Sequence, residues 1–212
     1  MPRWAMVIDL WKCVGCKTCS YACQGINKVP LWPQWRQVDE CEVEGFQGPD
    51  RIFLPRNCMH CSEAPCLSAC PTGATYRRSG GIIDIDYDLC IGCGSCIVAC
   101  PYHARAISYR DETPSAAFSP IAEGKKPADR VGICTKCNFC IQRVELGLEK
   151  GLRPGIDPEA SPVCVNCCIA GALSFGDLED PESNVSQLIK ENNTLRLNEE
   201  LGTEPSIYYI LE

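Results

Sequence analysis

Residues 90–101 read CIGCGSCIVACP, in which the cysteines follow a Cys-x2-Cys-x2-Cys-x3-Cys spacing and Pro101 comes directly after the last. Three cysteines with two residues between each can surround one face of a cubane iron–sulfur cluster. Gly92 allows the close backbone approach and the unusual φ value that such a loop needs. The fourth cysteine, Cys100, then faces away and binds the cluster of a partner motif. The stretch therefore predicts iron–sulfur motifs that work in pairs.

The pattern recurs along the chain, giving four motifs that decide the architecture. The first has the spacing of bacterial ferredoxins, the second has a middle gap longer by two residues, and the fourth is split by 23 residues. In chain order the motifs hold Cys13, Cys16, Cys19 and Cys23; Cys58, Cys61, Cys66 and Cys70; Cys90, Cys93, Cys96 and Cys100; and Cys137, Cys140, Cys164 and Cys168. Zinc ribbons use two widely separated cysteine pairs, so the spacing favours clusters over zinc.

The composition favours bound metal over disulfides. Nineteen cysteines in 212 residues is an odd count, and the segment before Cys13 has neither a secretory leader nor a twin-arginine signal. No run of about 18 apolar residues is present, so no membrane-spanning helix is expected. The formal net charge of -7 argues against nucleic acid as a partner, because phosphate binding needs clustered Lys and Arg.

Two assignments stay open in the fourth motif. Cys134 also has ferredoxin spacing to the next two cysteines, so either Cys134 or Cys164 could be the third ligand. Residues 162–173 read PVCVNCCIAGAL, and alignment with APCLSACPTGA of the second motif places Cys168 on a ligand and Cys167 on an alanine. We therefore expect Cys167, together with Cys41, to be an ordinary thiol.

Other side chains beside the motifs have a simpler expected role. His60 and His103 are expected to neighbour clusters or face solvent, because four cysteines are available to every cluster. Trp32 and Trp35 fit either a protein interface or packing against the chain's own surface.

Short elements are expected around the motifs. Apolar alternation predicts strands in 5–13, 80–90 and 204–212. Helices are expected in 20–27, 97–107 and 183–193. Loops are expected over 24–57, 110–133 and 141–163 because these segments lack periodicity or are punctuated by Gly and Pro.

The whole chain resembles the four-cluster electron-transfer (beta) subunit of molybdopterin oxidoreductases of the dimethyl sulfoxide reductase type. The residues that carry the resemblance are MVIDLWKCVGCKTCSYAC, NCMHCSEAPCLSACPTGA, DLCIGCGSCIVACPYHARAI and KCNFCIQRVELGLEKGLRPG. The closing FGDLEDPESNVSQLIKEN and GTEPSIYYI are similar to tails of polysulfide, thiosulfate, arsenate and phenylacetyl-CoA oxidoreductase beta subunits. Proline is absent after two closing cysteines, where Gln24 and Ile169 stand instead.

The resemblance implies an α+β fold of two bacterial ferredoxin-like units, each holding two [4Fe–4S] clusters, with long loop insertions. Residues 1–50 and 131–180 would form the outer unit and residues 51–110 the inner unit. Residues 111–130 would connect them, and residues 181–212 would be a C-terminal interaction tail.

The resemblance also implies four ligand sets, each combining three cysteines of one motif with the last cysteine of another. Site 1 would hold Cys13, Cys16, Cys19 and Cys168; site 2, Cys58, Cys61, Cys66 and Cys100; site 3, Cys90, Cys93, Cys96 and Cys70; and site 4, Cys137, Cys140, Cys164 and Cys23.

The expected function is electron relay without catalysis, because full thiolate ligation leaves no open iron position. The partners would be a catalytic subunit with a Mo/W-bisPGD molybdopterin and a membrane quinone-binding subunit or soluble acceptor, as in anaerobic respiration. The location would be cytoplasmic or membrane-associated through a partner, and periplasmic only with a signal-bearing partner. Two rival functions are a free-standing polyferredoxin and an iron–sulfur enzyme with one open iron, which would require Cys164 or Cys168 to be unbound.

Overall fold

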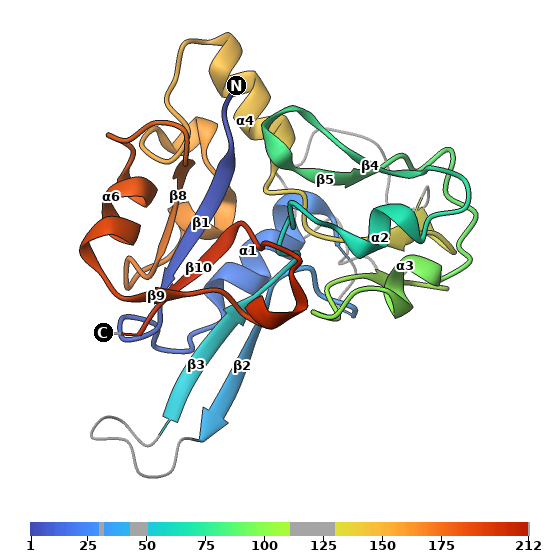
Figure 1. Cartoon of the computed structure of the whole chain (residues 1–212), viewed down its shortest axis with the longest axis horizontal. Coiled ribbons are helices and arrows are strands. Elements are labelled where there is room, and N and C mark those ends of the chain that lie inside the picture. Colours follow the sequence, from blue (N-terminus) through green and yellow to red (C-terminus); the bar gives the residue numbers. More distant parts are fainter. Residues whose placement is uncertain (30–31, 43–50, 111–129, 212) are drawn as a thin grey trace.

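The computed structural model describes residues 1–29, 32–42, 51–110 and 130–211. Helices and strands are both present, which agrees with the predicted α+β class. Figure 1 shows one part built around a four-stranded sheet and, beside it, a second part built from short hairpins and short helices. The two chain ends that the picture marks both belong to the part with the larger sheet.

The larger sheet has the strand order β8-β1-β10-β9. Its strands are β1 (Trp4–Asp9), β8 (Leu173–Asp177), β9 (Thr194–Leu195) and β10 (Ile207–Ile210). Strand β1 runs antiparallel to β8 and parallel to β10, with Met6 opposite both Phe175 and Ile207. Because β1 is covered on both faces, it reads as a continuous apolar run.

Helices cover the two faces of this sheet differently. On one face α6 (Asn184–Glu191) packs Val185 against Val7 and Ile210. The hydroxyl of Ser183 caps this helix by accepting a 3.2 Å bond from the backbone N–H of Ser186. The opposite face meets the helices of the outer motifs, which are α1 (Thr18–Asn27), α4 (Ile141–Glu149) and α5 (Val163–Asn166).

The second part contains shorter elements. They are α2 (Pro65–Ser68), β4 (Thr75–Arg77), η1 (Ser79–Gly81), β5 (Ile83–Ile85), α3 (Ser95–Val98), β6 (Ala106–Ile107) and β7 (Cys134–Thr135). Strands β4 and β5 pair antiparallel, and α2 packs beside α3. Strand β7, which precedes the fourth motif, pairs antiparallel with β6, which follows the third.

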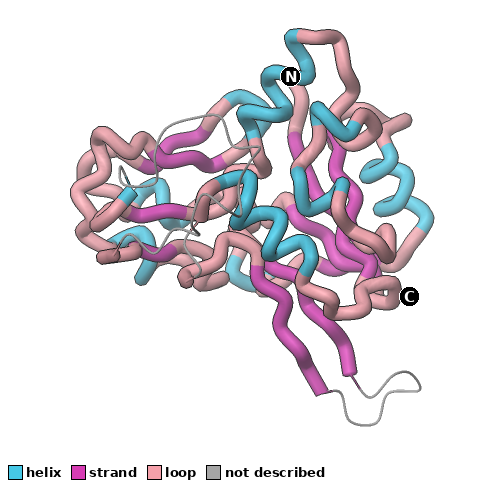
Figure 2. Tube along the Cα trace, turned by 180° about the vertical axis from the view of Figure 1, so that it is seen from behind, coloured by secondary structure: helices cyan, strands magenta, loops and turns pink. Residues whose placement is uncertain are grey.

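The expectation of a loop over residues 24–57 is wrong. Strands β2 (Gln37–Glu42) and β3 (Arg51–Arg56) form a two-stranded antiparallel sheet that projects from the molecule in Figures 1 and 2. Its inner end carries Val38, Phe53 and Leu54, which pack on the main core. Contact with that core therefore fixes strands that the local Pro-rich and Trp-rich sequence did not indicate.

Two further expectations need correction. Helix α4 occupies the start of the segment expected to be a loop over 141–163, and η4 (Pro158–Ala160) lies within it. After the third motif, α3 ends at Val98 and β6 follows at Ala106, so no helix continues through 97–107. Pro101 cannot donate a backbone hydrogen bond, which prevents an ordinary helix from continuing there. Most of the expected 110–133 loop lies outside the described residues.

The C-terminal segment supplies part of the core. The expected helix and strand are present as α6 and β10, and a short η5 (Glu199–Leu201) lies between them. Ile207 and Tyr209 on β10 are 0% exposed, and the Tyr209 hydroxyl donates a 3.1 Å hydrogen bond to the Pro55 carbonyl oxygen. Strands β9 and β10 are therefore integral to the larger sheet.

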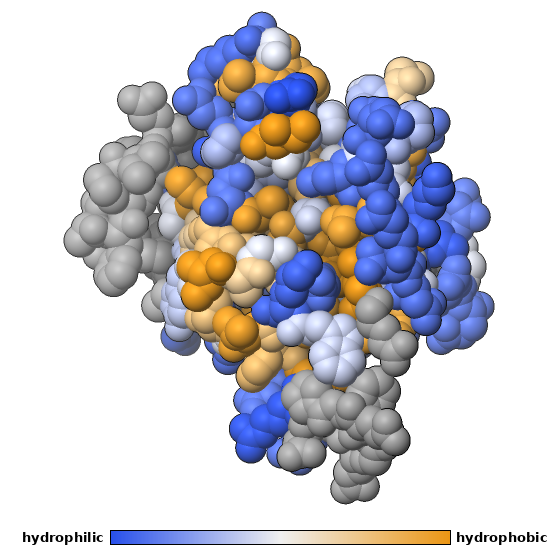
Figure 3. All heavy atoms as spheres, turned by 90° about the vertical axis from the view of Figure 1, so that its left-hand side faces the viewer, coloured by the Kyte–Doolittle hydropathy of each residue, from blue (hydrophilic) through white to orange (hydrophobic). Residues whose placement is uncertain are grey.

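On the face shown in Figure 3, apolar residues gather toward the middle of the view and hydrophilic residues cover much of its right-hand side. Among the described residues, no helix is both long enough and apolar enough to cross a membrane.

Candidate metal centres

Site 1 lies where the chain passes from β1 into α1. Its predicted cysteines, Cys13, Cys16, Cys19 and Cys168, line one cavity. Burial raises the pKa of Cys13, and the thiolates of Cys168 and Cys16 raise it further. The backbone N–H of Ala172 donates a 3.3 Å bond to Cys168 Sγ. Cys16 is exposed, so site 1 reaches the surface.

Site 3 has the same local construction in the second part of the molecule. Its predicted cysteines, Cys70, Cys90, Cys93 and Cys96, line a second cavity, and Cys93 is exposed. The backbone N–H of Thr75 donates a 3.4 Å bond to Cys70 Sγ. Gly92 has a φ of +68°, and a Cβ there would overlap the Gly132 carbonyl oxygen. The glycine expected from the sequence is therefore required by both conformation and space.

Site 2 is enclosed. Its predicted cysteines, Cys58, Cys61, Cys66 and Cys100, are each less than 10% exposed. Burial, together with the thiolates of Cys58, Cys66 and Cys100, raises the pKa of Cys61 to about 12. Nη2 of Arg105 donates a 3.0 Å hydrogen bond to Cys66 Sγ.

Site 4 joins α1 with the fourth motif. Its predicted cysteines are Cys23, Cys137, Cys140 and Cys164. Burial raises the pKa of Cys23, and the other three thiolates of the set raise it further. The side-chain amide of Asn27 lies 3.5 Å from Cys23 Sγ and 3.6 Å from Cys140 Sγ. Burial and the thiolates of Cys164 and Cys140 raise the pKa of Cys137 to about 12.

Three cysteines remain outside these sets. Cys134 lines the cavity of site 3 and its Sγ lies 3.5 Å from Cys96 Sγ, whereas Cys164 lies with site 4. Cys167 directly follows α5, and its Sγ lies 3.6 Å from the Cys164 carbonyl oxygen. Burial first, and then the thiolates of Cys164, Cys19 and Cys168, raise the pKa of Cys167 to about 12. Cys41 is on β2, paired with Ile52 across the hairpin.

The donor chemistry of the four sets fits iron–sulfur clusters. Burial first, and then the charges of neighbouring thiolates, raise the pKa of Cys61 and of Cys137, and bound iron would offset both effects. Buried polar atoms without a partner among the described residues lie beside the cysteines, including Arg36 Nη1 and Arg105 Nε. Cluster sulfides accept such N–H groups. Across the described ranges, no three His, Cys, Asp or Glu side chains are placed to hold a single metal ion.

Sequence reasoning missed the buried polar residues around these sets. Arg36 donates from Nη2 to Cys164 Sγ at 3.4 Å, and Asn57 donates from Nδ2 to Cys137 Sγ at 3.4 Å. Lys136 is 2% exposed and its ammonium donates to the carbonyl oxygens of Ile83 and Cys137. No spacing rule marks Arg36 or Asn57, because each is far along the chain from the cysteine whose sulfur it contacts.

His60, expected near a cluster or in solvent, is 1% exposed and its Nδ1 accepts a 3.1 Å bond from the backbone N–H of Ile83. Its ring lies 3.9 Å from that of Phe139. Burial holds the pKa of His60 well below its usual range, and the charges of Lys136 and Arg105 add to this effect. His60 is therefore a neutral packing residue in the metal-free chain.

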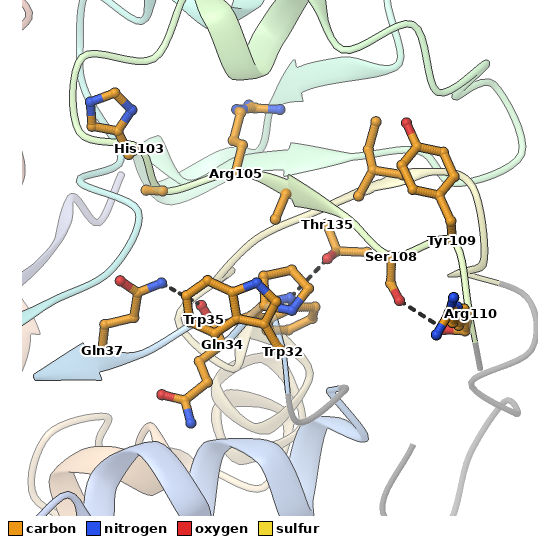
Figure 4. Close-up of a pocket in the computed structure, with 14 residues that line it drawn as sticks. Trp32, Gln34, Trp35, Gln37, His103, Arg105, Ser108, Tyr109, Arg110 and Thr135 are labelled. Carbon is orange, nitrogen blue, oxygen red and sulfur yellow. Dashed lines mark hydrogen bonds between the residues drawn. The ribbon is translucent and has the colours of Figure 1, made fainter. Parts of the chain in front are cut away.

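An open cavity of about 410 Å³ lies over the second part and includes His103 and Trp32 in its lining. In Figure 4 the Arg105 side chain points away from the two tryptophans. Trp35 is 6% exposed and donates from Nε1 to Thr135 Oγ1 at 3.1 Å, which gives it a packing role. Trp32 is 68% exposed.

Residues 49–117 match a family model described as a 4Fe-4S dicluster domain. The chain is 39% identical to a selenate reductase subunit of Mesobacillus selenatarsenatis, over 98% of this chain and 72% of that protein. It is 37% identical to the iron-sulfur cluster-binding subunit of menaquinone reductase of Nitratidesulfovibrio vulgaris, over 98% and 88%. It is 34% identical to a tetrathionate reductase subunit of Salmonella typhimurium, over 98% and 72%.

These similarities extend over nearly the whole chain. The relatives are iron–sulfur subunits of reductase complexes, and this is the family that the sequence predicted. The chain belongs to the iron–sulfur, electron-transfer subunits of the dimethyl sulfoxide reductase-type molybdopterin oxidoreductase family.

Proposed function

We propose that the chain carries four [4Fe–4S] clusters, one at each of sites 1 to 4, and relays electrons through them. The single observation that carries this proposal is the composition of the sets. Two cavities are each lined by three cysteines of one motif and the last cysteine of another, and that of site 3 also includes Cys134. In sites 2 and 4 the pKa of one cysteine is raised by the other three thiolates of its set, which again combines three cysteines of one motif with the last cysteine of another. Such sharing is how two-cluster ferredoxins bind iron.

The sites form a line in this proposal. Arg36 is in reach of thiolates from sites 1 and 4, because Cys19 and Cys164 both affect its pKa. Asn57 precedes site 2 and donates to Cys137 Sγ of site 4. Arg105 contacts Cys66 of site 2 and lies near Cys96 of site 3. The resulting order is site 1, site 4, site 2, site 3, with the exposed cysteines of sites 1 and 3 at the two ends.

The residues of the chain bind the clusters, keep those of sites 2 and 4 from water, and orient N–H donors toward sulfur atoms. Bound clusters supply one-electron oxidation and reduction. Four thiolates at each site leave no iron position for a substrate, so the chain does not catalyse bond changes alone. Sites 2 and 4, in the middle of the line, are built mostly from buried cysteines. Sites 1 and 3, at its two ends, reach the surface, where a partner can exchange electrons.

The two ferredoxin-like units are proposed as residues 1–50 with 131–180, holding sites 1 and 4, and residues 51–110, holding sites 2 and 3. Contacts between α1 and α5 and between α2 and α3 support this division. Residues 111–130 would connect the units, although 111–129 lie outside the described residues. Residues 181–212 would still offer exposed groups to a partner, although β10 belongs to the core.

The proposed partners are a molybdopterin (Mo/W-bisPGD) catalytic subunit and a membrane quinone-binding subunit or soluble acceptor. The names of the relatives, which include subunits of selenate, tetrathionate and menaquinone reductases, support a place within a complex. This place would be cytoplasmic or membrane-associated through the partners, and periplasmic if the catalytic partner carries the export signal. No observation favours a free-standing polyferredoxin or an enzyme with an open iron.

The test is a reductive titration of the anaerobically purified chain, followed by EPR and by iron and sulfide analysis. We expect about sixteen iron and sixteen sulfide per chain, since each cubane holds four of each, and four distinguishable reducible signals. Two or fewer cubane signals in a fully loaded chain would contradict the four-cluster proposal. Co-purification from the native host should recover a large molybdenum or tungsten protein, and its consistent absence would argue for a free-standing carrier.

A further inference from the structure

Arg105 is a buried cation placed between two cysteine sets. It is 4% exposed, and its Nη2 donates the 3.0 Å bond to Cys66 Sγ of site 2. Its Nη1 donates to Thr75 Oγ1 at 3.1 Å and lies 3.9 Å from Cys134 Sγ at the edge of site 3. One guanidinium therefore reaches the surroundings of both sites in the second part of the molecule.

Arg36 occupies the corresponding place in the first part. It is 2% exposed, and its Nη2 donates to Cys164 Sγ at 3.4 Å and to Met6 Sδ at 2.9 Å. Cys164 and Cys66 are the same position of their respective motifs, the third cysteine. The two arginines come from unrelated segments, one just before β2 and one just before β6, yet both contact that equivalent sulfur.

Neither guanidinium is neutralised by a carboxylate. Within the described residues, neither Arg36 nor Arg105 takes part in an ion pair with Asp or Glu, and each keeps one N–H without a partner. A buried cation is costly unless a nearby anion compensates it. The anions near each guanidinium are cysteine thiolates of two sites, Cys164 and Cys19 for Arg36 and Cys66 and Cys96 for Arg105.

We propose that Arg36 and Arg105 are positioning residues for electron transfer, each raising the reduction potentials of the two clusters that it lies between. Arg36 would act on sites 1 and 4, and Arg105 on sites 2 and 3. Adding one electron to a cubane makes the site more negative by one charge. A nearby cation and N–H donors to sulfur stabilise that reduced form more than the oxidised one. The low polarity of a buried site strengthens both effects.

This inference rests on the proposed four-cluster function, and its test is chosen to separate the two. The variants are Arg36→Gln and Arg105→Gln, which remove the charge and keep a side chain that can donate one hydrogen bond. The matched control is Arg78→Gln, because the Arg78 guanidinium is paired with carboxylates, those of Asp84 and Glu145, and not with a thiolate. The reduction potential of every EPR signal is measured by redox titration, alongside iron content.

With Arg105→Gln we expect two of the four signals to move to lower potential, and with Arg36→Gln we expect the other two to move. Arg78→Gln should leave all four in place, and iron content should be unchanged throughout. Full iron content with unmoved potentials in both arginine variants would overturn the inference and leave the four-cluster proposal standing. A fully loaded wild-type chain with two or fewer cubane signals would instead count against the proposed function.

A glutamine variant that loses iron is replaced in the test by Arg36→Lys or Arg105→Lys. The charge then remains but becomes a compact ammonium without the planar fork, so fewer sulfur atoms receive a hydrogen bond. We expect the two EPR signals assigned to that arginine to move to lower potential, by less than the loss of the whole charge would move them. Unmoved potentials in an iron-complete lysine variant would overturn the proposed role of that arginine.

Discussion

The Sγ atoms of Cys96 and Cys134 lie 3.5 Å apart, and the backbone N–H of Cys134 donates to Cys90 Sγ at 3.4 Å. Cys134 therefore borders site 3, although its spacing in the sequence suggested a ligand for the fourth motif. The hydrogen-bond contact with the Cys134 thiol, and then the charge of Arg105, lower the pKa of Cys96 to about 6. Cys134 thus favours the thiolate form of its neighbour.

This contact predicts different outcomes for two cysteine variants. Cys164→Ala should remove about a quarter of the bound iron, because one of four cubanes loses a ligand. Cys134→Ala should keep the full iron content and move one EPR signal to lower potential, because a donor to Cys96 is lost. Iron analysis and EPR titration check both. Loss of a cluster in Cys134→Ala together with full iron in Cys164→Ala would reverse the assignment.

A second pair of variants tests the adjacent cysteines Cys167 and Cys168. Cys168 lines the cavity of site 1, whereas the Cys167 thiol faces the Cys164 carbonyl oxygen. Cys168→Ala should lower bound iron by about one quarter and remove one cubane signal. Cys167→Ala is its control and should retain every signal. A chain that keeps four clusters without Cys168 would show that another group holds the fourth position of site 1.

Alanine substitutions at two glycines of the third motif distinguish the cost of backbone strain from the cost of steric overlap. Gly92 and Gly94 both have positive φ, but an added Cβ overlaps Gly132 only at Gly92 and meets nothing within 4 Å at Gly94. Gly94→Ala should cost about 1 kcal/mol of unfolding free energy from its φ alone. Gly92→Ala should cost more and should reduce the occupancy of site 3. Thermal unfolding and iron content of the two variants give the comparison, and equal costs would contradict the close approach to Gly132.

Removing iron should destabilise the protein strongly, since many buried side chains of the two largest apolar clusters are cysteines of the four sites. Binding energy for a site that exists only in the folded chain adds directly to stability. We expect the melting temperature of the chelated chain to be lower than that of the loaded chain by about 10 °C or more. Circular dichroism under anaerobic conditions measures this, and equal melting temperatures would show that the apolar core suffices.

The metal-free chain should also lose stability in alkali. Burial raises the pKa of Cys61 and Cys137 from an ordinary value of 9.0 to about 12. Between those values the folded chain holds protons that the unfolded chain has released, so the unfolding free energy falls as pH rises. Iron-bound thiolates carry no such protons, so the loaded chain should lack this decline. Urea unfolding at about pH 7 and about pH 10 tests the difference, which would vanish if these thiols were accessible to water.

The cysteine spacing was sufficient to predict iron–sulfur motifs, because such a loop is set by local covalent reach. The family and the α+β class followed from the resemblance that these motifs and the closing segment carry. The sequence also indicated β1, α6 and β10, whose alternation or amphipathic pattern is strong. It did not indicate β2 and β3, because their pairing depends on a core formed by distant residues such as Ile8 and Tyr209. Helix α4 was hidden by the Gly- and Pro-rich sequence that follows it.

The buried polar residues were beyond sequence reasoning for a related reason. Arg36 reaches Cys164, and Arg105 reaches Cys66, only after the sheet and hairpins have brought separate segments together. An arginine in a loop is usually a solvated surface residue, so its residue type alone gave no signal. Only burial without a carboxylate partner among the described residues distinguishes these two.

The position of β10 has a consequence for biosynthesis. It pairs in parallel with β1, so the earliest of the described strands to leave the ribosome acquires that neighbour only when nearly all of the described chain has been made. Cys13 and Cys168 are likewise far apart in the order of synthesis, whereas the cysteines of sites 2 and 3 all lie between residues 58 and 100. Domains generally fold as units during synthesis. A nascent chain would therefore be able to receive the clusters of sites 2 and 3 early. Site 1 would remain an incomplete set of exposed thiols until the segment with Cys168 has emerged. Until then these thiols would need protection from oxidation.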